Sequence, residues 1–124
     1  MPSIEKLFKG YPRVISGILG TYLSPDPRKM WLILSGTIGH VTGTDTSFYV
    51  ASKPFRAGDT TLDILLDIVI PSATASGRYN IWNTVAGLNG SMAMPIFIDS
   101  HFCLGLKTGD SVATFYLQVL EFDI

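Results

Sequence analysis

The segment Thr61–Ile70 constrains the fold more than any other part of this sequence. Its even positions read Leu, Ile, Leu, Ile and Ile, and its odd positions read Thr, Asp, Leu, Asp and Val. This is the period of a β-strand with one buried face, because successive side chains on a strand point to opposite sides. In a helix the two aspartates would fall among the leucines. The segment therefore predicts a strand that packs one face against a core.

Turn residues divide the rest of the chain into pieces of strand length. We expect further strands at Arg13–Leu23, Lys29–Ile38, Ser47–Lys53, Arg78–Val85, Met92–Ile98, His101–Leu106 and Val112–Ile124. Short strands between clusters of Gly, Pro, Asn and Asp are typical of all-β sandwiches and barrels. Eight strands in 124 residues predict an antiparallel β-sandwich, a single eight-stranded jelly roll, over residues 13–124.

The amino-terminal segment, residues 1–12, is expected to be a short helix or an arm. Ile4, Leu7 and Phe8 would share one face of such a helix. Because a helix of fewer than two turns is not stable alone, we expect this face to dock on a neighbouring chain.

Composition excludes several classes of function. Charged residues make up only 15% of the chain and the net charge is −1, so no overall field attracts nucleic acid or an anionic membrane. A single cysteine excludes a disulfide framework within the chain. No apolar run approaches the ~20 residues of a membrane span. The first apolar stretch lacks a signal-peptide cleavage site, so we do not expect secretion by a signal peptide.

Two expected strands carry apolar residues on both faces. In Lys29–Ile38, one face holds Met30, Leu32, Leu34 and Ile38, and the other holds Trp31 and Ile33. In the last strand, a phase change at Val119-Leu120 suggests a bulge. A two-layer sandwich buries only one face of each sheet, so we expect another subunit, or alternatively a loop of the same chain, to cover the other. The residues expected at an interface between subunits are Ile4, Leu7, Phe8, Trp31, Ile33, Phe115, Leu117, Phe122 and Ile124.

Few residues suggest chemistry. His40, His101 and Cys103 could supply at most three ligands to a metal ion, which leaves a small metal-dependent jelly-roll enzyme as the second alternative. We expect no catalytic residue, cofactor or metal ion. Tyr79, Trp82 and Asn83 form the best candidate platform for a sugar, so a carbohydrate- or receptor-binding module is the second hypothesis.

The carboxyl-terminal pattern Leu104-x-Leu106-x-x-Gly109-Asp110-x-Val112, followed by a long apolar strand, is similar to the closing hairpin of trimeric jelly-roll domains. Such domains occur in complement heads, tumour-necrosis-factor-like ligands and many virion spike or decoration proteins. The resemblance covers only this stretch, and it implies a trimer that buries aromatic residues around a threefold axis. Without a secretory signal, the virion and phage-particle members fit best.

We therefore expect a non-enzymatic structural assembly protein of a virus or phage particle, such as a decoration, minor capsid or fibre-head protein. It would form a homo-oligomer, with a trimer favoured, in a virion assembled in the host cytoplasm. A major capsid protein, or another particle protein, is the further partner that this hypothesis suggests. No nucleic acid or membrane partner is expected.

Overall fold

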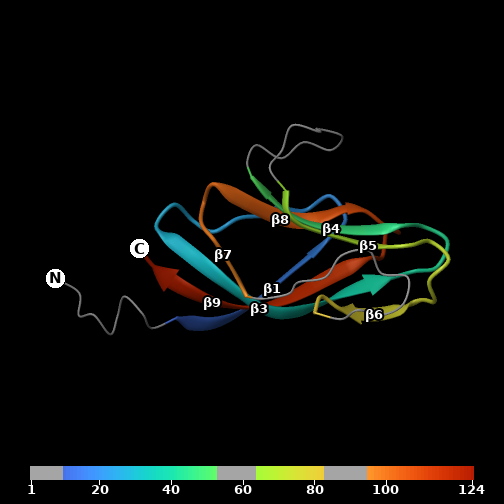
Figure 1. Ribbon diagram of the computed structural model, residues 1–124, viewed down its shortest axis with the longest axis horizontal. Coiled ribbons are helices and arrows are strands. Elements are labelled where there is room, and N and C mark those ends of the chain that lie inside the picture. Colours follow the sequence, from blue (N-terminus) through green and yellow to red (C-terminus); the bar gives the residue numbers. More distant parts are fainter. Residues whose placement is uncertain (1–9, 53–63, 83–94) are drawn as a thin grey trace.

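The computed structural model describes residues 10–52, 64–82 and 95–124, and the regular structure within these ranges consists of β-strands. Antiparallel strands form two sheets that face each other, so this part of the chain is an all-β sandwich, as predicted (Figure 1). The strands are β1 (Tyr11–Ile18), β2 (Tyr22–Leu23), β3 (Lys29–His40), β4 (Thr46–Ser52), β5 (Ile64–Ile70), β6 (Gly77–Asn80), β7 (Ile96–Ile98), β8 (Phe102–Thr108) and β9 (Thr114–Asp123).

The chain crosses repeatedly between the two sheets. Sheet A has the strand order β1-β9-β3-β6, and β7 pairs with β3 along the same edge as β6. Sheet B has the order β2-β8-β4-β5. Because β8 lies in sheet B and β9 in sheet A, residues 109–113, which include Gly109-Asp110 of the carboxyl-terminal pattern, connect the two sheets.

The first expected strand, Arg13–Leu23, is two strands in different sheets. A turn separates β1 from β2, and in it the Thr21 backbone N–H donates to the Ile18 carbonyl over 3.1 Å. Gly20 has a φ of 85°, a left-handed conformation that glycine adopts without steric cost. The glycine therefore allows the chain to leave sheet A and enter sheet B within three residues.

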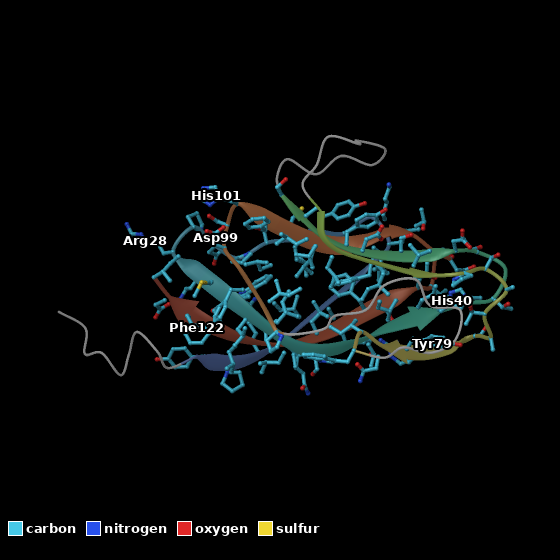
Figure 2. The ribbon with its side chains drawn as sticks, in the orientation of Figure 1. Arg28, His40, Tyr79, Asp99, His101 and Phe122 are labelled. Carbon is cyan, nitrogen blue, oxygen red and sulfur yellow. The ribbon has the colours of Figure 1, made fainter. Side chains whose placement is uncertain are left out.

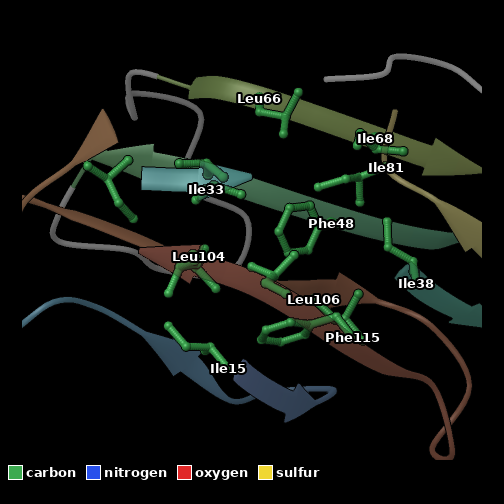
Figure 3. Packing of buried hydrophobic residues seen from close by; sticks show 14 of the residues in the cluster. Ile15, Ile33, Ile38, Phe48, Leu66, Ile68, Ile81, Leu104, Leu106 and Phe115 are labelled. Carbon is green, nitrogen blue, oxygen red and sulfur yellow. The ribbon is translucent and has the colours of Figure 1, made fainter. Parts of the chain in front are cut away.

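The core fills the space between the sheets. Phe48 from sheet B meets Phe115 from sheet A with ring centroids 5.6 Å apart. Around this pair, Ile38, Ile68 and Leu106 are almost wholly buried (Figure 3). Leu66, Ile68 and Ile70 of β5 point into this core, which is what the alternation of the segment predicted.

A β-bulge in β3 explains why this strand appeared apolar on both faces. Ile33 pairs with Val119 and Ser35 pairs with Gln118, so Leu34 is an extra residue that has no partner in β9. Before the bulge the odd positions face the core, and after it the even positions do. The expected bulge at Val119-Leu120 was wrong, because β9 contributes consecutive residues there and the extra residue belongs to β3.

The sandwich begins at Tyr11 and not at residue 13, because Tyr11 and Pro12 pair with β9 as the start of β1. The rest of the expected amino-terminal segment, residues 1–9 with Ile4, Leu7 and Phe8, lies outside the described residues. No helix in the described ranges is long and apolar enough to cross a membrane.

Candidate interaction surface

The outer face of sheet A, which points away from sheet B, carries a continuous set of apolar side chains. The register places them together, since Leu32 pairs with both Leu120 and Phe97, and Leu120 also pairs with Pro12. We call this set the apolar patch; it consists of Pro12, Val14, Met30, Leu32, Leu34, Phe97, Leu120 and Phe122.

Several residues of the apolar patch are open to solvent. Val14 is 66% exposed and Phe97 is 55% exposed. Phe122 is only 8% exposed, because the ring of Phe97 lies 6.1 Å from its own ring. The Phe122 ring also packs directly against Gly10, where a Cβ atom would lie 2.8 Å from it. The patch is hollowed by about 360 Å³ between Pro12, Val14 and Leu120. A sheet face of this kind is not covered by the described part of the chain.

Charged side chains next to the patch point away from it, toward the other face of sheet A. The Arg13 guanidinium donates to Glu121 Oε2 over 2.7 Å, and the Trp31 indole N–H donates to the same oxygen over 2.8 Å. Lys29 of β3 forms an ion pair with Asp123 of β9, two residues along each strand from Trp31 and Glu121. The Trp31 hydrogen bond and, secondly, the Arg13 guanidinium lower the pKa of Glu121. The apolar patch itself therefore carries no charge.

The outer face of sheet B differs, because its own side chains cover much of it, with Leu65 of β5 still 49% exposed. The Lys107 ammonium donates to the Tyr49 hydroxyl over 3.2 Å and lies 5.0 Å from the centre of that ring. Gly105 has no Cβ, which makes room for the ring of Tyr22. Burial raises the pKa of Asp67, which pairs with Tyr49 across the sheet, and Lys107 partly offsets this. Sheet A is therefore the better candidate for contact with another protein.

Four of the residues predicted at an interface lie elsewhere. Ile33, Phe115 and Leu117 are fully buried between the sheets, and Trp31 is buried on the same face beside Glu121. Their prediction as interface residues was wrong, because the bulge at Leu34 reverses which positions of β3 face outward, and β9 alternates regularly with its odd positions inward.

Phe122 and Ile124 remain predicted interface residues. Phe122 belongs to the apolar patch, and Ile124, just beyond the end of β9, is 62% exposed. The other members of the patch were not predicted as interface residues. Met30, Leu32 and Leu34 were expected on the same face as the core residue Ile38, but the bulge places them on the opposite face.

Tyr79 and Trp82 do not form the platform that was predicted for a sugar. The Tyr79 hydroxyl donates to the Ala75 carbonyl over 2.5 Å, and the Trp82 indole N–H donates to the Leu34 carbonyl over 2.6 Å. Both rings pack against the core. Asn83 lies outside the described residues. The two aromatic rings are thus structural, and Trp82 satisfies the carbonyl of the bulged residue.

The histidines lie at opposite ends of the sandwich (Figure 2). The Nδ1 atom of buried His40 is hydrogen-bonded to the Thr46 hydroxyl over 2.8 Å, and its Nε2 donates to the Thr74 carbonyl over 3.1 Å. His101 is exposed in the turn before β8, where its backbone N–H and ring contact Asp99 and lower the pKa of that carboxyl. Cys103 is buried in β8. These residues do not converge, and the described ranges contain no group of three or more potential metal ligands.

Comparisons with protein-family models, with curated proteins and with solved structures gave no match for this chain. Its function must therefore be inferred from the surfaces described above.

Proposed function

We propose that this chain is a non-enzymatic structural protein that assembles with copies of itself through the outer face of sheet A. The observation that carries the proposal is the exposed, uncharged apolar patch, which contrasts with the covered outer face of sheet B. Fully burying one large apolar side chain is worth about 1.5–3 kcal/mol, so pairing several partly exposed ones yields a substantial driving force. Leaving such a face in water favours aggregation.

The apolar patch is wide enough to form the centre of an interface between subunits. It spans four adjacent strands, β1, β9, β3 and β7, which at a spacing of about 4.8 Å make it roughly 19 Å wide. An interface centred on the patch lies at the end of sheet A where β7 pairs with β3, and not at the end where β6 pairs with β3.

A second copy is the occupant that the chemistry of the face favours. The apolar patch contains no charged residue, so two identical patches can meet without repulsion between like charges. Arg13, which borders the hollow of the apolar patch, is neutralised by its ion pair with Glu121.

The strand pairs support a jelly roll as the fold that presents this face. If β7 is regarded as an addition at the edge of β3, the remaining strands pair first with last: β1 with β9, β2 with β8, β3 with β6, and β4 with β5. These pairs form when one long hairpin of eight strands wraps around a core. The proposed fold is therefore a single eight-stranded jelly roll.

The proposed setting is a virus or phage particle, in which the chain would be a decoration, minor capsid or fibre-head protein assembled in the host cytoplasm. This part of the proposal is supported by the similarity of Leu104–Val112 to trimeric jelly-roll domains. A trimer is the favoured assembly, and a major capsid protein is the proposed further partner.

The assembly is tested by sedimentation velocity on Val14→Lys and Phe97→Lys, which place a charge on exposed positions of the apolar patch. We expect both variants to sediment as folded single chains of 13.5 kDa while the wild type stays assembled. The matched control is Leu65→Lys, because Leu65 is 49% exposed but lies in sheet B. Assembly that survives both patch substitutions, or that is lost only in Leu65→Lys, would contradict the proposal.

A further inference from the structure

We infer that a saccharide-binding site lies on the outer face of sheet A, next to the apolar patch and separate from the sugar platform predicted from the sequence. The site is a hollow of about 230 Å³ whose polar lining comes from Ser35, Thr37, Asn80, Tyr116 and Gln118. We call it the polar hollow. The inference does not depend on self-association, because it rests on the hydrogen-bonding groups of one chain.

Strand register brings these side chains together from three separate parts of the sequence. Tyr116 of β9 pairs with Thr37 of β3, and Thr37 pairs with Asn80 of β6, so the three form one row across the sheet. Gln118 and Ser35 form the next row. Because partners in a row lie on the same face, their side chains surround one hollow.

Two side-chain amides at the polar hollow are held in a fixed orientation by the protein itself. Asn80 Oδ1 accepts from the Trp82 backbone N–H over 2.8 Å, and Gln118 Oε1 accepts from the Ser35 hydroxyl over 3.0 Å. Each amide therefore uses its acceptor internally and keeps its NH₂ group as a donor. Among the described residues, these NH₂ groups have no hydrogen-bond partner.

Tyr116 supplies an aromatic surface to the polar hollow. Its side chain is 48% exposed, and its hydroxyl has no partner among the described residues. The Arg78 guanidinium lies 4.7 Å from the ring centre and is held by the hydroxyls of Thr37 and Thr114, each over 3.1 Å. Gly39 allows this arrangement, because a Cβ there would lie 2.9 Å from the guanidinium. The cation and the ring are thus fixed as a unit.

The combination of groups indicates the class of ligand. Preoriented amide donors, hydroxyls and a half-exposed aromatic ring match the alternating hydroxyls and C–H faces of a sugar. The hollow is smaller than the ~300–1,000 Å³ pockets that hold drug-sized ligands, so it suits one or two sugar rings. No carboxylate lines the part of the hollow that the structure describes, and the Arg78 guanidinium lies against Tyr116, so neutral or acidic sugars fit and sugars with a free cationic amino group do not.

The test is saturation-transfer NMR of the intact protein with galactose, N-acetylglucosamine and glucuronic acid as probes. We expect transfer to at least one of these sugars. Asn80→Asp and Gln118→Glu keep the internal acceptor bonds but remove the NH₂ donors, so each is expected to weaken binding about tenfold. Tyr116→Ala should abolish detectable transfer. The matched control Tyr11→Ala should not, since Tyr11 is exposed to a similar extent, 54% against 48%, on the same sheet but outside the hollow.

Two results would overturn the inference: no transfer to any of the three sugars, or transfer that is unchanged in both amide variants. Circular dichroism of each variant establishes that it is folded, and Tyr116→Phe preserves the ring if the alanine variant does not fold. Asn80→Asp should not change the sedimenting mass, because Asn80 does not belong to the apolar patch and does not line its hollow. A loss of sugar binding with the assembly intact therefore separates this site from the proposed function.

Discussion

Replacement of Phe115 by alanine should destabilise the fold strongly without acting on assembly directly. Phe115 is fully buried, and its ring packs against Phe48 from the opposite sheet. Removing a buried phenylalanine ring typically costs 3–5 kcal/mol, through lost burial and the cavity left behind. At about 4 °C per kcal/mol for a domain of this size, the melting temperature should fall by roughly 12–20 °C.

The assay is thermal unfolding followed by circular dichroism at one fixed protein concentration, because assembly makes the melting temperature depend on concentration. Tyr116→Ala is the matched control, since Tyr116 is the next residue of β9 but faces outward. It loses chiefly its contact with Arg78, worth about 0.5–1 kcal/mol at an exposed site, so its melting temperature should fall by only a few degrees. A Phe115→Ala variant that melts near the wild type but sediments as a single chain would refute the assignment of Phe115 to the core.

Two further predictions concern local interactions of sheet A. Glu121→Gln should cost about 1 kcal/mol at neutral pH, because it weakens the bonds from Trp31 and the half-exposed Arg13. The fold lowers the pKa of Glu121, so the stability that its charge contributes is present above the unfolded-state pKa and is lost as the pH falls through the folded-state pKa. The urea midpoints of the wild type and Glu121→Gln should therefore converge in acid. A difference that stays constant with pH would contradict the role of the charge. Gly36→Ala should lower the free energy of unfolding by about 1–3 kcal/mol, because the new Cβ would lie 2.5 Å from the Tyr116 carbonyl oxygen. Gly77→Ala should be nearly neutral, because the nearest atom to its new Cβ would be 3.9 Å away. Equal urea midpoints for these two variants would contradict the close packing near the bulge.

The all-β sandwich could be predicted because its signal is local. The alternation in Thr61–Ile70 identifies a strand within ten residues, and most other strand positions follow from turn residues on either side. The prediction failed where one residue changes the phase. Leu34 is an ordinary apolar residue, so nothing in its type marks a bulge, yet it decides that Trp31 and Ile33 face the core and that Leu32 faces outward.

The two candidate sites could not be predicted for a different reason. Asn80, Thr37 and Tyr116 are far apart in sequence and meet only because β6 and β9 pair with opposite edges of β3. The sugar platform predicted from the sequence lies next to Asn80, but it consists of Tyr79 and Trp82, whose rings pack against the core, together with Asn83. Which of several adjacent polar and aromatic residues faces outward depends on strand register, and register is set by long-range pairing.

Sedimentation velocity of the wild-type protein over a dilution series tests the central claim most directly, because it measures whether the chain associates with other copies of itself. We predict one dominant species at three times the mass of the 13.5 kDa chain, which dissociates only at the lowest concentrations. A wild-type protein that sediments as a single, soluble 13.5 kDa chain at every concentration would contradict the account.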